Sequence, residues 1–264
     1  MPEQSQTFIK VAGWEDLNIV HGFGTASFKA DFDVEDEQLR ENLKHASVEF
    51  AAEEAMLQNH GKFETLITVK QIHSRNLLQI SRFDLSLPAS ERIRCDGIIC
   101  DRPGVLIGIK TADCFPILLF DPEACVTAAL HSGWRGTLHR IASHGVGRMA
   151  AAFGARPKRI KAAIGPGIGP CCYEVDEYLA AEFRKTFGEE TIAKSRNGGV
   201  SLDLTTAIKK DLLSAGLSEE NIVTLNFCTA CSKEHEFDSW RRDRSHTCRL
   251  LSVIGIPREK KQTA

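Results

Sequence analysis

Long apolar segments are absent from this sequence. No run of about 18 apolar residues occurs, so we expect no membrane-spanning helix. The first residues, MPEQSQTFIKVAGWEDL, also lack the basic start and apolar core of a secretion signal. Nine cysteines in a chain without an export signal are typical of reduced thiols. We therefore expect a cytoplasmic protein.

A strong excess of one charge is also absent, since the formal net charge is -2 at pH 7. This balance gives no electrostatic reason to expect a nucleic-acid or anionic-membrane partner. The sequence has no G-x-G-x-x-G between a strand and a helix and no Walker A loop, which argues against dinucleotide and P-loop sites. We expect a small-molecule substrate and no obligatory protein partner.

The hydrophobic pattern predicts an α+β fold. At 264 residues the chain is long enough for a substantial core. Apolar periodicity predicts helices over 34–57, from about Gly136 to Phe153, over 175–187 and over 204–215. Short apolar runs predict strands in the segments LITVKQIH, RNLLQI, DGIIC, VLIGIK, PILLF, VTAALH, RIKAAI, NIVTLNFCT and RLLSVIGI. Because the strands cluster in the middle of the chain, we expect one layered domain over 1–264, with mixed β-sheets sandwiched by helices.

Three residues suggest an open metal site: His73 in VKQIHS, Cys114 in TADCF and His131 in LHSGWRG. Each stands where a strand-like run breaks into a loop. One thiolate and two imidazoles form a three-ligand set that leaves a fourth position for water or substrate. Asp113 could orient an imidazole or a metal-bound water. This pattern favours an enzyme over a structural zinc site.

A family resemblance rests on several segments that occur in order: VKQIHS, DGIIC, TADCFPILLF, HSGWRGT, IGPGIGPCCYEV, LDL, FCTACS and SWRRDRSHTCRLLSVI. From His73 onward the chain resembles the laccase-domain purine nucleoside phosphorylases, also called multicopper polyphenol oxidase-like proteins and peptidoglycan editing factors. The resemblance implies a cysteine hydrolase-like fold and metal ligands at His73, Cys114 and His131. It also implies zinc, or else copper, as the metal. The implied activities are phosphorolysis of adenosine, inosine and methylthioadenosine, and deamination of adenosine.

Phosphorolysis needs an anion site, and arginine suits phosphate oxygens. Arg135 in GWRG and the pair Arg241–Arg242 are the candidates, with Cys114, Asp113 and Arg135 as candidate catalytic residues. The family segment around the pair is altered here, because FDSWRRDR replaces an F-Y-S-Y-R-R-D-G pattern. Substrate contacts in this segment are therefore expected to differ.

Two alternative functions use the same residues. Cys114 could act as a thiolate nucleophile, with His73 or His131 as its base, in a hydrolase for peptidoglycan precursors. Copper-dependent phenol oxidation fits less well, because the chain has nine histidines and no H-x-H pair.

Four further cysteines have two possible interpretations. Cys228 and Cys231 form a C-x-x-C, which Cys171 and Cys172 could complete to a structural zinc site. A four-cysteine site usually has two separated C-x-x-C pairs, so the sequence favours buried or locally paired thiols near the pocket.

Overall fold

The computed structural model describes residues 8–26, 62–84, 86, 93–234, 236–244 and 248–258, and the statements below concern these residues. The helix expected over 34–57 lies outside them. The described chain forms a six-stranded sheet, a five-stranded sheet, a two-stranded ribbon and a group of helices.

The six-stranded sheet carries most of the central strands. Its order is β12-β9-β7-β8-β5-β4. The strands span Ile222–Thr224 (β12), Lys161–Ile164 (β9), Phe115–Asp121 (β7), Val126–Ser132 (β8), Gly97–Cys100 (β5) and Leu77–Ile80 (β4). The outer pairs β12–β9 and β4–β5 are parallel, whereas the inner pairs are antiparallel, so the sheet is mixed.

The five-stranded sheet joins distant parts of the sequence. Its order is β1-β2-β13-β6-β3. The strands span Phe8–Ile9 (β1), Val20–Gly24 (β2), Leu250–Gly255 (β13), Val105–Thr111 (β6) and Thr65–Ile67 (β3). Strand β13 lies between β2 and β6 and is antiparallel to both, and β3 is parallel to β6. The ribbon pairs β10 (Ile192–Lys194) with β11 (Val200–Leu202).

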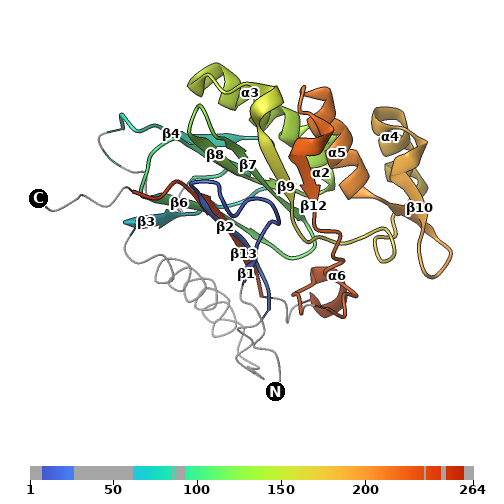
Figure 1. Cartoon of the computed structure of the whole chain (residues 1–264). Helices are drawn as coiled ribbons and strands as arrows, with labels where there is room; N and C mark the ends of the chain where they lie inside the picture. Colours follow the sequence, from blue (N-terminus) through green and yellow to red (C-terminus); the bar gives the residue numbers. More distant parts are fainter. Residues whose placement is uncertain are drawn as a thin grey trace, which may run out of the picture.

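The α-helices between residues 134 and 214 pack on the side of the six-stranded sheet that faces away from the five-stranded sheet, whereas the short helix over 240–243 lies apart from them (Figure 1). The α-helices span Trp134–Leu138 (α2), Ile141–Phe153 (α3), Glu177–Phe187 (α4), Leu204–Ser214 (α5) and Trp240–Asp243 (α6). Short 3-10 turns occupy Pro157–Arg159, Glu189–Thr191 and Glu219–Asn221. Aspartates begin two of the helices, because Asp176 accepts from Leu179 N at 2.8 Å and Asp203 from Thr206 N at 3.0 Å.

Strand β7 shows why its sequence is a continuous apolar run. Alternate side chains of a strand point to opposite faces. Ile117 and Leu119 pack with the helices, whereas Leu118 and Phe120 pack toward the five-stranded sheet. All seven residues of β7 are buried. The strand therefore lies between two apolar layers and needs no polar face.

The predicted fold class is confirmed as α+β with mixed sheets. The helix expected after Gly136 is divided into α2 and α3, since Arg140 between them has a φ of 56°. The long strand expected in LITVKQIH is only β3 in this structure. No described helix has the length and apolar character to cross a membrane.

Candidate metal centre

Cys114 lies on the turn that connects β6 in one sheet to β7 in the other. The preceding residue, Asp113, has a φ of 84°, a conformation that L-residues seldom adopt. Its carbonyl accepts from Ile168 N at 2.8 Å, which fixes the turn against the loop after β9. The thiol is therefore positioned by the crossing between the two sheets.

The other two ligand candidates are held by one carboxylate, that of Asp96. His131, on β8, makes a 2.9 Å hydrogen bond through Nδ1 to Asp96 Oδ1. The same carboxylate accepts from the backbone N–H of His73 at 2.8 Å and from that of Ser74 at 2.6 Å. His73 has a φ of 59°, and these bonds stabilise that conformation. The sequence analysis did not identify Asp96. The only feature of the sequence that could have pointed to it is its position directly before the strand GIIC.

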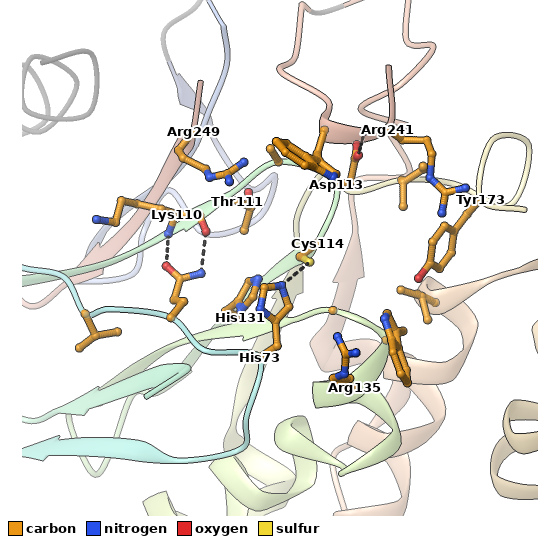
Figure 2. Close-up of a pocket in the computed structure, with 18 of the residues that line it drawn as sticks. His73, Lys110, Thr111, Asp113, Cys114, His131, Arg135, Tyr173, Arg241 and Arg249 are labelled. Carbon is orange, nitrogen blue, oxygen red and sulfur yellow. Dashed lines mark hydrogen bonds between the residues drawn. The ribbon is translucent and has the colours of Figure 1, made fainter. Parts of the chain in front are cut away.

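The three donor atoms of His73, Cys114 and His131 all lie within 4.8 Å of one another. Cys114 Sγ is 3.9 Å from His73 Nε2, and the two imidazole centroids are 4.9 Å apart. Because Nδ1 of His131 is bound to Asp96, its Nε2 faces the thiol. Tetrahedral zinc with bonds of about 2.0 to 2.3 Å places its ligand atoms about 3.3 to 3.8 Å apart, which is close to the distance between Cys114 Sγ and His73 Nε2. The donor set therefore fits one metal ion with an open position (Figure 2).

Gly133, in the segment HSGWRG, makes room for this arrangement. A Cβ atom at position 133 would lie 2.7 Å from Cys114 Sγ and 3.4 Å from the His73 ring. A side chain would therefore displace the thiol. Glycine at this position allows the backbone to lie close to the ligands Cys114 and His73.

The thiol and the imidazole of His131 stabilise each other's charge. Burial would raise the pKa of Cys114, but the nearby imidazoles of His131 and His73 outweigh it and lower this pKa to about 6. Burial would likewise lower the pKa of His131, but Cys114 and Asp96 raise it to about 9. The metal-free site therefore holds a thiolate–imidazolium pair, and a metal ion would displace a proton from it.

A cavity of about 650 Å³ opens over the three ligands. This volume suits a small molecule. Its walls bring together five cationic side chains and three large aromatic ones: Lys70, Lys110, Arg135, Arg241, Arg249, Trp134, Tyr173 and Trp240. The protein as a whole is nearly neutral, whereas the lining of this pocket holds five cationic side chains and one carboxylate, that of Asp113.

Of the three predicted arginines, two line the cavity and one does not. Arg135 and Arg241 line the cavity, and their guanidiniums lie 4.2 Å from the Trp134 ring and 5.2 Å from the Tyr173 ring, respectively. Arg242 is not among the lining residues. Its guanidinium donates to the carbonyls of residues 229, 230 and 237 and to a neighbouring carboxylate. Arg249, which replaces it at the cavity, was not among the predicted residues.

The contacts of Asp113 also differ from those expected. Its carboxylate accepts from Thr229 Oγ1 at 2.7 Å and from Arg241 N at 2.6 Å. The hydrogen bond to a ligand imidazole is made by Asp96 instead. Asp113 therefore fixes the segment that carries Arg241 to the turn that carries Cys114.

The fold and the site define an α+β protein with a three-ligand, metal-capable centre at the base of a cationic pocket. Residues 22–257 match the family model described as multi-copper polyphenol oxidoreductase laccase. Because this match covers most of the chain, the protein belongs to that family.

Individual relatives agree with this assignment. A protein of Deinococcus radiodurans named purine nucleoside phosphorylase is 45% identical over 64% of this chain and 64% of its own length, so this chain spans just under two thirds of that relative. A protein of an unknown prokaryotic organism named adenosine deaminase RL5 is 32% identical over 67% of this chain and 70% of its own. The crystal structure of YlmD from Geobacillus stearothermophilus superimposes with a TM-score of 0.75 at 30% identity, covering 96% of this chain and 99% of that one.

Proposed function

We propose that this protein is a zinc-dependent enzyme of purine nucleosides. It would cleave adenosine, inosine and methylthioadenosine with phosphate and deaminate adenosine. One observation carries the proposal: three ligand atoms leave a fourth metal position that faces a pocket rich in cations and aromatic rings. The names of the relatives, phosphorylase and deaminase, support both activities.

His73, Cys114 and His131 would hold the ion, and Asp96 would orient two of these ligands. Bound zinc supplies a Lewis acid and lowers the pKa of water to about 7. In deamination, a water oxygen bonds to C6 of adenine and the bond from C6 to the exocyclic amino nitrogen breaks. One water proton leaves with that nitrogen as ammonia, and the other goes to N1 of the purine. Once His131 has lost its proton to the incoming ion, the Cys114 thiolate and the Asp96 carboxylate would supply the negative charge that favours a cation at this position.

Phosphorolysis requires the remaining pocket residues. The bond between ribose C1′ and the purine nitrogen breaks while a phosphate oxygen bonds to C1′, and the purine leaves with a proton. Arg135, Arg241 and Arg249, which line the pocket, would bind the incoming phosphate. Trp134 offers a face for the base. Burial raises the pKa of Tyr173 to about 12, so its hydroxyl stays protonated and can donate to substrate.

Asp113 acts in this proposal as a positioning residue. Its bond to Arg241 N holds the backbone of that arginine at the pocket. Arg242 is left out of the anion site, because its donors are already bound to carbonyls and to Asp243.

The test combines metal content with turnover in the same samples. Wild type, Cys114→Ala and Arg135→Ala are analysed for metal and assayed with adenosine in the presence and absence of phosphate. We expect Cys114→Ala to lose the ion of this site and both activities. Arg135→Ala should keep the metal and lose about 10- to 100-fold in phosphorolysis, since a charged hydrogen bond contributes about 1.5 to 3 kcal/mol.

Arg184→Ala is the matched control, because Arg184 pairs with Glu177 and Glu189 on the surface of α4. It should retain metal and activity. A wild-type protein that releases neither free purine nor inosine from adenosine would reject the proposal. If the metal analysis found copper in place of zinc, the metal site would stand and only the identity of the ion would change.

The lowered pKa of Cys114 favours a second candidate, a hydrolase with a Cys114 nucleophile. His131, which pairs with the thiolate, or His73, whose Nε2 lies 3.9 Å from Sγ, would take the thiol proton. Peptidoglycan precursors would be the substrates. This function predicts that chelator-treated, metal-free protein stays active, whereas the zinc enzyme would be inactive until zinc is restored.

A further inference from the structure

A second cluster of metal-ligating side chains lies outside the pocket floor. Cys171 and Cys172 stand in the loop after β9, and Cys228 and Cys231 in the loop between β12 and α6. All four are free and half-buried. The two loops are far apart in sequence, yet they meet through an isolated bridge between Gly167 and Cys228.

The four sulfur atoms are spaced for a single ion. All lie within 4.8 Å of one another, and Cys171 Sγ is 3.5 Å from Cys231 Sγ. A tetrahedral zinc ion with Zn–S bonds of about 2.3 Å places its sulfurs about 3.8 Å apart. A cluster of several irons would hold its thiolates further apart than one ion does. The spacing therefore matches one tetrahedral ion, and four thiolate ligands favour zinc among the single ions.

Two of the four sulfurs receive hydrogen bonds of the kind that stabilise thiolates. Gly169 N donates to Cys228 Sγ at 3.2 Å, and Arg196 Nη2 donates to Cys231 Sγ at 3.0 Å. A Cβ atom at Gly169 would lie 3.2 Å from Cys228 Cβ and 3.5 Å from Cys171 Sγ. The glycine allows the close approach, and the cation of Arg196 offsets part of the negative charge that four thiolates would leave on a zinc ion.

We propose that Cys171, Cys172, Cys228 and Cys231 bind one zinc ion. Four protein ligands leave no position for water or substrate, so this ion is structural. The proposal does not depend on the reaction catalysed at the pocket, because the ligands of the two sites are different residues.

The ion would fix one wall of the pocket. Next to Cys228, Thr229 donates through Oγ1 to Asp113 at 2.7 Å and accepts from Arg242 at 3.1 Å through its carbonyl. Next to Cys172, Tyr173 lines the pocket. By joining these two loops, the zinc would fix the position of Tyr173 relative to the turn that carries Cys114.

The test counts zinc in the full-length protein. Wild type should hold about two zinc ions per chain, and Cys114→Ala and the double variant Cys228→Ser/Cys231→Ser about one each. Cys125→Ser changes an exposed cysteine outside the cluster and should keep about two. Zinc unchanged in the double variant, or absent from Cys114→Ala, would overturn the proposal.

A spectroscopic measurement covers the case in which the double variant does not fold. Cys114→Ala is stripped of zinc and loaded with Co²⁺ alone. We expect the intense thiolate-to-cobalt charge transfer and the visible bands of a tetrahedral four-sulfur site. Three outcomes would each refute the zinc site. The variant could fail to bind cobalt, the isolated protein could contain iron in place of zinc, or its mass could be lower by two hydrogens because of a disulfide within the cluster.

Discussion

Asp96 is a buried residue that joins two ligands of the candidate metal centre. Burial would raise its pKa, but hydrogen bonds from His131 and Ser74 outweigh this and lower the pKa to about 2. The carboxylate therefore remains ionised across the physiological range. It sets which nitrogen of His131 faces the pocket and holds the backbone of His73 in place.

Asp96→Asn should weaken zinc binding at this centre by about 10- to 100-fold. An amide places an N–H₂ group where the carboxylate accepts hydrogen bonds, so the orientation of His131 and His73 is lost. Competition with a chromogenic chelator measures the affinity. Asp101→Asn is the control, because Asp101 is also buried but binds Arg82. Equal affinities of Asp96→Asn and wild type would contradict the role of Asp96.

Cys114 should be unusually reactive in metal-free protein. Its pKa of about 6 predicts that alkylation by iodoacetamide rises with pH around a midpoint near that value, below the value of about 8.5 for a free thiol. The rate is measured by mass spectrometry of the Cys114 peptide in a Cys125→Ser background. His131→Ala should raise the midpoint, and added zinc should block the reaction. A midpoint near 8.5 in the unmodified site would disprove the ion pair.

At the scale of elements, β2 contains a buried histidine. His21 Nε2 accepts from Val11 N at 3.0 Å, and its ring packs edge-on to Trp14 at 5.1 Å. Burial, helped by the charge of Lys10, lowers the pKa of His21 to about 4. The folded state therefore holds a neutral imidazole where the unfolded chain, with a pKa of 6.5, takes up a proton.

This difference predicts a loss of stability on acidification. Between pH 6.5 and 4 the unfolded state binds more protons, so the free energy of unfolding should fall by about 3 kcal/mol and then level off. Urea denaturation across this range measures it. His21→Gln keeps an acceptor for Val11 N without the titration, so its stability should vary less over the same interval. Parallel pH profiles for the two proteins would exclude His21 as the cause.

The elements also show how far the sequence predicts this protein. Strands β5 to β9 are predicted because each is an apolar run buried in the sheets, and helices α4 and α5 are predicted because each has one apolar face that is buried. The short strands β1, β2, β10 and β11 are missed, because each has too few residues to show a periodic pattern. Strand β2 also depends on pairing with the distant β13. His73, Cys114 and His131 are predicted as one group, and the structure brings them together. Asp96, Arg249 and Tyr173 carry no local signal that separates them from structural residues.

At the scale of the whole molecule, the two sheets touch closely at Gly165, just after β9. A Cβ atom there would lie 2.2 Å from the Phe23 ring in β2 and 2.8 Å from Pro116. The contact crosses the interface between the sheets. The organisation as one domain over 1–264 and the cytoplasmic location stay predictions.

Gly165→Ala should therefore lower the free energy of unfolding by about 1 to 3 kcal/mol through overpacking between the sheets. Gly147→Ala is the matched control, since a Cβ at that exposed position of α3 has nothing within 4 Å. It should raise stability by up to about 1 kcal/mol, because alanine favours helix. Chemical denaturation of both variants measures the difference. Equal stability of the Gly165 variant and wild type would show that the sheets can separate without cost.

The place of β13 between β2 and β6 has a consequence for biosynthesis. A ribosome completes β2 and β6 well before it reaches Leu250–Gly255, so the nascent chain carries two strands whose facing N–H and C=O groups await a partner. Open strand edges invite pairing with other chains. Translation that stalls before Leu250 would therefore release an aggregation-prone product, and nascent chains of this protein should depend on protection by chaperones until β13 has emerged.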